Sequence, residues 1–122
     1  MSEMKPLVYL AGPYALPDPV LNTHKMIKAA TEMYEEGLCV PLVPHLTLLW
    51  HMVTPRPLNF WLELDLEQLK HCDALMRFPG ESTGADAEVA FALSYQMPVF
   101  YVGLDDHAFK VWAKHYINDP SV

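Results

Sequence analysis

A short acidic turn carries the densest group of reactive side chains in the sequence. It runs from Gly80 to Glu88 and brings three carboxylates within eight residues, together with the hydroxyl of Ser82. Apolar residues 74–78 before the turn predict a strand, and residues 89–93 after it predict a helix. Parallel α/β sheets bind ligands at such strand ends, where the N–H groups of a helix attract anions. Taken alone, however, the turn is better explained as an ordinary capped helix.

Asp65 interrupts the apolar stripe of a second predicted helix. We expect this helix to be capped by Asn59 and to run to about Lys70. Asp65 lies three residues after Leu62 and four before Leu69, so it shares their core-facing side. A buried carboxylate must be paired, hydrogen-bonded or protonated, because an unpaired buried charge is costly. Asp65 could serve only to cap a neighbouring loop, but its position favours a chemical role.

Further polar groups lie in or just after predicted strands. Tyr9 lies inside the first strand and, taken alone, is expected to be a core aromatic residue. His45 follows the second strand on the ligand side of the sheet, although a lone loop histidine is more often merely solvated. Gly12, Pro13 and Tyr14 follow the first strand without the repeated glycines of a dinucleotide-binding or phosphate-binding loop. We therefore predict no cofactor.

The cysteines and the remaining histidines give no sign of a metal site. Cys39 and Cys72 form neither a metal-type pair nor a disulfide framework. We expect both to be buried free thiols, as in a reducing compartment. No metal ion is predicted, because the other histidines considered lack metal-ligand spacing with a carboxylate or a thiol: His51, His71, His107 and His115.

Composition and charge narrow the class of protein. The 122 residues are 52% hydrophobic and 19% charged, which predicts one folded domain over residues 1–122. The net charge is −7 and the eight Lys and Arg are scattered, so a nucleic-acid partner is not expected. No apolar run reaches the ~18 residues of a membrane span, and the N-terminus lacks a signal segment. These features predict a cytoplasmic protein without nucleic-acid or membrane partners.

The order of the predicted elements indicates an α/β fold. Strands alternate with helical segments, which requires a parallel sheet with right-handed crossovers. We predict an open parallel sheet of four to five strands with helices on both faces, a flavodoxin- or Rossmann-like three-layer sandwich. The first helix should begin at Asp18-Pro19 and end at Gly37. The connection from Pro44 to Pro57 is long enough to be functional or mobile. The expected strands are residues 7–11, 38–42, 74–78 and 98–102, and the last helix is expected at residues 107–117.

Three fragments of the sequence carry a resemblance to a known family. They are Tyr9-Leu10-Ala11-Gly12-Pro13, then Asp65-Leu66 followed by Leu69 and Asp73, and finally Ser82-x-Gly84-x-Asp86-x-Glu88. In this order, on a matching α/β frame, they resemble the nucleoside 2-deoxyribosyltransferase superfamily, including its nucleoside 5′-monophosphate N-glycosidase branch. The resemblance covers about residues 7 to 102. It is closest to small phage and bacterial members with a Pro-Gly-Glu-Ser turn, as at residues 79–82.

The resemblance implies a two-step reaction at a carboxylate. The family's glutamate nucleophile attacks the anomeric carbon of the sugar and displaces the base, and it corresponds to Glu88. The glycosyl-enzyme is then resolved by water or by a second base. The strand tyrosine corresponds to Tyr9, which would orient Glu88, and the helical aspartate corresponds to Asp65, which would exchange a proton with the leaving base. The helix N-terminus near Glu88 would help to keep it ionised.

The resemblance also bears on the substrate. Ser82 stands where free-nucleoside transferases carry an aspartate and monophosphate hydrolases carry a serine, which favours a nucleotide. The hydrolases' arginine after the first strand is missing here, so a phosphate would depend on backbone N–H groups, Ser82, His45, Arg56 or a partner subunit. Asp86 replaces a small residue of the family and could bind sugar hydroxyls or crowd the site with negative charge. The predicted substrate-binding residues are Gly12, Pro13, Tyr14, His45, Ser82, Gly84 and Asp86.

The predicted partners are a small nucleoside or nucleotide and a second copy of the chain. A homodimer or a higher homo-oligomer is expected because Trp50 lies on the long connection with little core to cover it, and because residues 109–116 have aromatic surface to spare. The resemblance also implies a site shared between two subunits. Two other functions stay open, a non-catalytic nucleotide-sensing domain and an interaction scaffold. The joint presence of Tyr9, Asp65 and Glu88 favours the enzyme.

Overall fold

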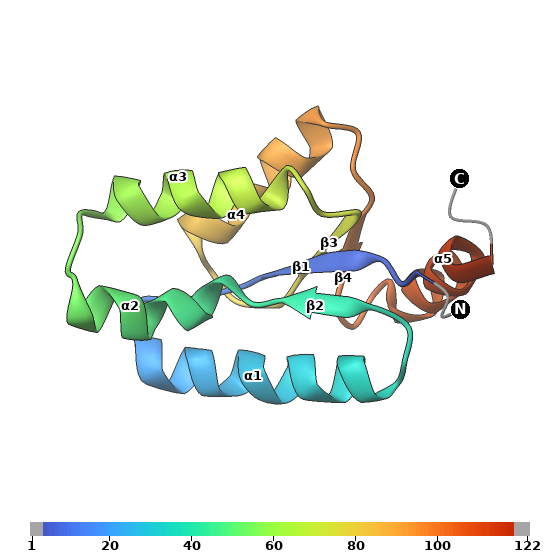
Figure 1. The fold of residues 1–122 in the computed structure, drawn as a ribbon, viewed down its shortest axis with the longest axis horizontal. Helices are drawn as coiled ribbons and strands as arrows, with labels where there is room; N and C mark the ends of the chain where they lie inside the picture. Colours follow the sequence, from blue (N-terminus) through green and yellow to red (C-terminus); the bar gives the residue numbers. More distant parts are fainter. Residues whose placement is uncertain (1–3, 119–122) are drawn as a thin grey trace.

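Four parallel strands form an open sheet in the order β2-β1-β3-β4 (Figure 1). The computed structural model describes residues 4–118, and its strands are β1 (Leu7–Ala11), β2 (Val40–Leu42), β3 (Ala74–Arg77) and β4 (Val99–Tyr101). Helices α1 (Pro19–Glu35) and α5 (Asp106–Asn118) cover one face, and α3 (Leu58–Leu69) and α4 (Thr83–Ser94) cover the other. The short helices η1 (Pro44–Leu46) and α2 (Thr47–Val53) follow β2. The predicted three-layer α/β fold is confirmed.

The side chains of β1 alternate between two hydrophobic cores. Val8 and Leu10 pack in the core under α1 and α5, whereas Tyr9 and Ala11 pack in the core under α3 and α4. All four are completely buried, as expected of an apolar strand that is covered on both faces. This alternation places the Tyr9 side chain on the α3–α4 side of the sheet.

The ends of α1 follow the local signals in the sequence. The Asp18 carboxylate accepts a hydrogen bond from the Val20 N–H at 3.0 Å, and Pro19 occupies the first helical position. Gly37 comes directly after the C-cap residue Glu36 and has a φ of +80°, a left-handed conformation that favours glycine. Both predicted boundaries of this helix are therefore confirmed.

The predicted cap of α3 at Asn59 is wrong. Helix α3 begins at Leu58 and not after a cap at Asn59, because the Pro57 carbonyl oxygen already accepts a hydrogen bond from the Phe60 N–H at 3.0 Å. Asn59 therefore lies inside the first turn. The long connection predicted at residues 44–57 contains the short helices η1 and α2. The prolines of this segment stand at helix starts or between helices, where they do not disrupt helical hydrogen bonds.

Candidate active site

A cavity of about 120 Å³ lies at the carboxyl ends of the strands. Gly12 follows β1, His45 follows β2, and Ser82 follows the loop after β3. The chain passes from β1 to β2 and then returns to β3 on the other side of β1, so the cavity lies where the strand order reverses. Seven of the predicted site residues line it: Gly12, Tyr14, His45, Asp65, Ser82, Gly84 and Glu88.

Glu88 connects this cavity to the central strand. Helix α4 buries Ala85, Glu88, Val89 and Ala92 at helical spacing, so the Glu88 side chain points towards the sheet. Glu88 is only 6% exposed, and its Oε2 accepts a hydrogen bond from the hydroxyl of Tyr9. Tyr9 is fully buried in β1 and does not line the cavity itself. It holds the Glu88 carboxylate in a fixed orientation.

Asp65 reaches the same cavity from α3. It faces inward as predicted, at the end of a stripe in which Leu58, Trp61 and Leu62 also line the cavity. Its Oδ1 is buried and has no hydrogen-bond partner among residues 4–118. Burial, and then the negative charge of Glu88, raise the pKa of the Asp65 carboxyl from 3.8 to about 7. Asp65 therefore keeps its proton to a much higher pH than an ordinary aspartate.

The surroundings of the two carboxyl groups differ in a way that separates their roles. Burial raises the pKa of Glu88 to about 7, but the Tyr9 hydrogen bond and the positive charge of Arg77 oppose this rise. Asp65 has no such opposing contact. When the pair holds one proton, we therefore place the proton on Asp65 and the charge on Glu88. The Tyr9 hydroxyl stays protonated, because burial and the charges of both carboxylates raise its pKa.

The helix dipole adds little to this difference. With Thr83 as the first residue of α4, Glu88 is the sixth, beyond the first turn in which the dipole acts, so that expectation is wrong. The acidic residue of the first turn is Asp86. Its Oδ1 pairs with Nη2 of Arg77 at 2.9 Å, and Arg77 also donates to the Gly80 carbonyl at 3.0 Å. Asp86 does not line the cavity, and its contact stabilises the turn.

The turn before α4 packs against the loop after β1. Gly80 has a φ of +116°, and a Cβ atom at this position would lie 2.7 Å from Cγ of Pro13, so a glycine is required. Ser82 caps α4, because its Oγ accepts a hydrogen bond from the Ala85 N–H at 3.0 Å. The hydrogen of this hydroxyl remains free to donate to a ligand. Gly84 lines the cavity next to it.

His45 is a buried part of the cavity lining. It is 3% exposed, and its Nε2 donates a hydrogen bond to the Pro13 carbonyl at 2.9 Å. Pro13 thus supports His45 and does not line the cavity, whereas the Tyr14 ring lies 5.8 Å from the imidazole. Burial lowers the pKa of His45, which favours the neutral ring. Nδ1 is then a buried acceptor without a partner in the part of the chain that the structure describes.

One wall of the cavity has no counterpart among the predicted site residues. This α2–α3 wall consists of Thr47, His51, Leu58, Trp61 and Leu62. Trp61 donates its indole N–H to Nδ1 of His51 at 2.8 Å, which joins the two helices. The helical spacing of the α3 residues with Asp65 is the signal in the sequence that could have indicated this wall. Arg56, a predicted phosphate contact, lies 5.5 Å over the Phe60 ring and does not line the cavity.

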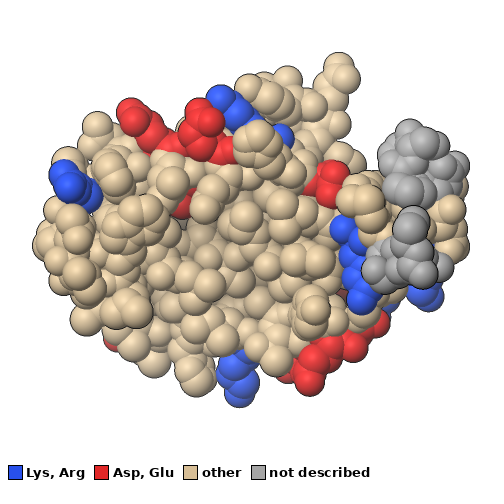
Figure 2. Space-filling view, viewed as in Figure 1, with Lys and Arg blue, Asp and Glu red and all other residues tan. Residues whose placement is uncertain are grey.

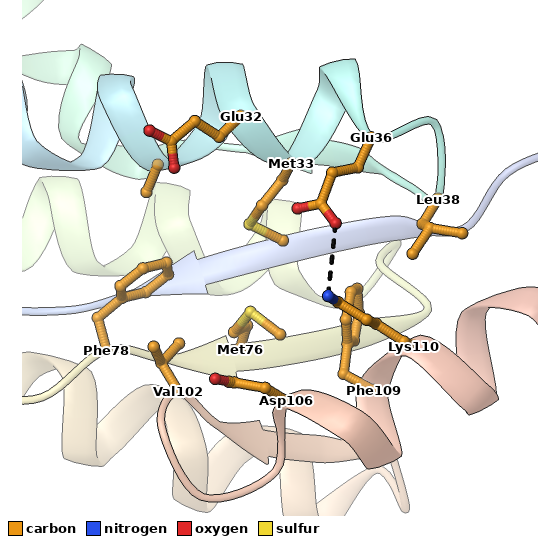
Figure 3. A pocket seen from close by; sticks show the side chains of 11 residues that line it. Glu32, Met33, Glu36, Leu38, Met76, Phe78, Val102, Asp106, Phe109 and Lys110 are labelled. Atoms are coloured by element: carbon orange, nitrogen blue, oxygen red, sulfur yellow. Dashed lines mark ion pairs between the residues drawn. The ribbon is translucent and has the colours of Figure 1, made fainter.

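A larger cavity of about 280 Å³ lies on the other face of the sheet, between α1 and α5 (Figure 3). Met33 and Met76 contribute to its apolar lining, and Glu36 and Lys110 form an ion pair across it at 3.7 Å. None of the predicted site residues lines this cavity. The candidate active site is therefore the smaller cavity at the strand ends.

Metal ligands are not grouped in the described structure. Within residues 4–118, no three His, Cys, Asp or Glu side chains are placed to hold a metal ion. Cys39 and Cys72 are free and buried, as predicted. None of the helices described combines the length and the apolar character that crossing a membrane requires.

Comparison with known proteins supports the fold. A solved structure described as a 2-deoxyribosyltransferase from Leishmania mexicana matches the chain with a TM-score of 0.56 and 17% sequence identity. The match covers 79% of this chain and 63% of that one, so the chain spans less than two thirds of the length of that structure. No protein-family model matches the sequence, and no curated protein matches it either. At this level of identity the likeness shows a common fold.

Proposed function

We propose that the protein cleaves the N-glycosidic bond of a (deoxy)nucleoside or of its 5′-monophosphate, with Glu88 as the nucleophile. The observation that carries this proposal is the buried hydrogen bond from Tyr9 to Glu88, whose carboxylate lines the same cavity as Asp65. A site that only binds a ligand has no need for two buried carboxyl groups with separate protonation states. The deoxyribosyltransferase fold of the structural neighbour is consistent with this chemistry.

The reaction would proceed in two steps through a covalent intermediate. The ionised Glu88 carboxylate attacks the anomeric carbon of the sugar and forms a glycosyl ester, while the bond from this carbon to the base breaks. The bonding electrons go to the base, which takes the proton held by Asp65. In the second step water, or a second base, gives its proton to Asp65 and attacks the same carbon. Glu88 then leaves as a free carboxylate.

The substrate's 5′ end would face the start of α4. The Ser82 hydroxyl and the first N–H groups of α4 are suited to a phosphate, which favours a monophosphate. No Lys or Arg lines the cavity of the described chain, and Arg77 is committed to Asp86 and to the Gly80 carbonyl. A phosphate would therefore depend on Ser82 and these N–H groups, or on a cation from a second subunit.

Replacement of Glu88 by glutamine tests the nucleophile directly. Glu88→Gln should retain the fold and lose cleavage by several orders of magnitude, because an amide cannot form the glycosyl ester. The native protein and the variant should be incubated with a panel of nucleosides, deoxynucleosides and their monophosphates, with and without an added acceptor base. Freed or exchanged base is measured by chromatography.

The matched control is Glu81→Gln, which changes an exposed carboxylate of the same turn outside the cavity and should leave cleavage unchanged. Near-native cleavage by Glu88→Gln would contradict the proposed mechanism. If the native protein binds members of the panel but cleaves none, the protein is a nucleotide-binding domain on this fold.

A further inference from the structure

His51 is held in one orientation and one protonation pattern by its neighbours. Its Nδ1 accepts a hydrogen bond from the indole N–H of Trp61 at 2.8 Å and a second one from the Arg56 backbone N–H at 3.3 Å. An indole N–H can only donate, so Nδ1 carries no proton in this arrangement. The proton of the neutral ring is therefore on Nε2, which makes Nε2–H a hydrogen-bond donor.

The other polar groups of the α2–α3 wall already have hydrogen-bond partners within the described residues. The Thr47 hydroxyl donates to the Pro44 carbonyl at 2.9 Å, and the Trp61 N–H is engaged with His51. Leu58 and Leu62 are apolar. Within the described residues, Nε2–H of His51 is thus the one side-chain donor of this wall that is not already used.

The α2–α3 wall and the carboxyl pair line the same cavity. Trp61, which binds His51, precedes Asp65 by four residues on α3, so the two side chains lie on the same face of this helix. A base that receives the proton of Asp65 would therefore lie in the cavity that His51 also lines, where Nε2–H could meet a carbonyl oxygen of the base.

We propose that His51 donates a hydrogen bond from Nε2–H to a carbonyl oxygen on the leaving base, so that the site selects 6-oxopurine and 4-oxopyrimidine nucleosides over their amino counterparts. This inference rests on the proposed function, because it assumes that the base occupies the cavity between Asp65 and the α2–α3 wall. An amino group at the same position would direct its own N–H towards Nε2–H. Two donors would then face each other, and both would lose their hydrogen bonds to water.

The test compares substrate pairs that differ at this one position. The kcat/KM of the native protein should be about tenfold or more higher for 2′-deoxyinosine than for 2′-deoxyadenosine, and likewise for thymidine over 2′-deoxycytidine. His51→Phe keeps a ring but removes the donor, so both ratios should fall close to one. His71→Phe is the matched control, since His71 is exposed and lies outside the cavity, and it should keep the native ratios. A uniform loss on all four substrates would indicate a structural role and would overturn the inference, as would a native preference for the amino substrates.

Binding of free bases separates this inference from the proposed reaction. Calorimetry should show that hypoxanthine binds the native protein more tightly than adenine, and that His51→Phe removes the difference. If this result is obtained but no nucleoside is cleaved, the proposed reaction fails and the role of His51 stands. If nucleosides are cleaved but His51→Phe leaves both ratios unchanged, the role of His51 fails alone. Should His51→Phe not fold, Trp61→Phe releases Nδ1 and should also reduce the ratios.

Discussion

At the residue scale, the central feature is a pair of buried carboxyl groups with unequal surroundings. Tyr9 donates to Glu88 and the charge of Arg77 acts on it, whereas Asp65 has a buried oxygen without a partner. In the proposed reaction, these contacts, and not the position of either residue along the chain, would distinguish the nucleophile Glu88 from the proton donor Asp65. The separation depends on pH, because the pKa of each carboxyl is raised to about 7.

The rate of cleavage should therefore have a bell-shaped dependence on pH, with its maximum near neutral pH. At low pH both carboxyls are protonated and Glu88 cannot attack, and at high pH both are ionised and Asp65 has no proton to give.

Asp65→Asn should lower kcat/KM about 100-fold or more for ordinary nucleosides and should abolish the alkaline limb of this pH profile. Stopped assays across pH 4 to 10 give both limbs. 7-Methyl-2′-deoxyguanosine serves as the control substrate, because its base leaves without being protonated. Its kcat/KM should therefore change little in Asp65→Asn. An equal loss on this substrate would make Asp65 a structural residue.

Replacement of Ser82 tests whether the site binds the 5′-phosphate of a nucleotide. The Ser82 hydroxyl can donate to a ligand while its oxygen caps α4, so Ser82→Ala should raise the KM for nucleoside monophosphates by about tenfold. The KM for free nucleosides should change much less. Because the cap is also lost, the thermal unfolding of the variant has to be measured alongside. A native preference for free nucleosides would assign the protein to transferase-like chemistry on unphosphorylated substrates.

At the scale of the elements, the site depends on contacts between neighbouring loops. Gly80 combines a φ of +116° with close contact to Pro13, whereas Gly103 has a φ of +92° with nothing within 4 Å of its missing Cβ. Gly80→Ala should lower the free energy of unfolding by about 3 kcal/mol, because backbone strain and a steric clash add up. Gly103→Ala should lower it by about 1 kcal/mol through backbone strain alone. Urea unfolding of both variants measures these free energies. Equal losses in the two variants would show that the contact with Pro13 does not contribute to stability.

The sequence predicts the elements whose signals are local and misses those that depend on packing. The cap of α1 at Asp18, the glycine after it and the buried strand at residues 7–11 all follow from short-range chemistry. Helix α2 has no side-chain cap and only seven residues, so its helicity depends on packing against η1, α1 and α3, which no local pattern shows. The pairing of Arg77 with Asp86 escapes notice for the same reason, since the two residues meet only once β3 and α4 are folded.

The sequence also predicts only part of the candidate site. Asp65 could be found because it breaks an apolar pattern, and the roles of Tyr9 and Glu88 came from resemblance to a family. The spacing of Trp61 with Asp65 on α3 is a signal that the sequence does carry, whereas the contact of Trp61 with His51 runs between two helices and leaves no such pattern.

At the scale of the whole molecule, exposed apolar side chains gather around η1, α2 and the start of α3. Figure 2 shows this side of the molecule with few charged side chains over α2. These exposed side chains include Leu46, Leu49, Trp50, Met52, Val53 and Leu58. The predicted spare aromatic surface of residues 109–116 is partly wrong, because Phe109 is buried and Trp112 packs against Phe100. The apolar surface around α2 remains the argument for a homodimer.

A dimer through this surface is a prediction that light scattering can check. The cavity of about 120 Å³ is smaller than the ~300 Å³ or more of typical small-molecule pockets, so a second copy over α2 would also enlarge the site. The native chain should scatter as at least twice its 13.9 kDa mass. Leu49→Glu should give monomers, while Val111→Glu, at a comparably exposed position on α5, should not. A fully active native monomer would remove both the dimer and the shared site.

The location of Tyr9 in the central strand has a consequence for how the protein can change over evolutionary time. Tyr9 is fully buried in a strand that pairs on both sides, so its position beneath Glu88 is kept as long as the sheet is intact. Residues of α2 are all at least partly exposed, and substitutions there disturb the sheet little. The proposed bond cleavage would thus depend on an intact sheet, whereas the proposed choice of base could change through single substitutions in α2. Divergent copies of such a chain are expected to differ first in which base they release.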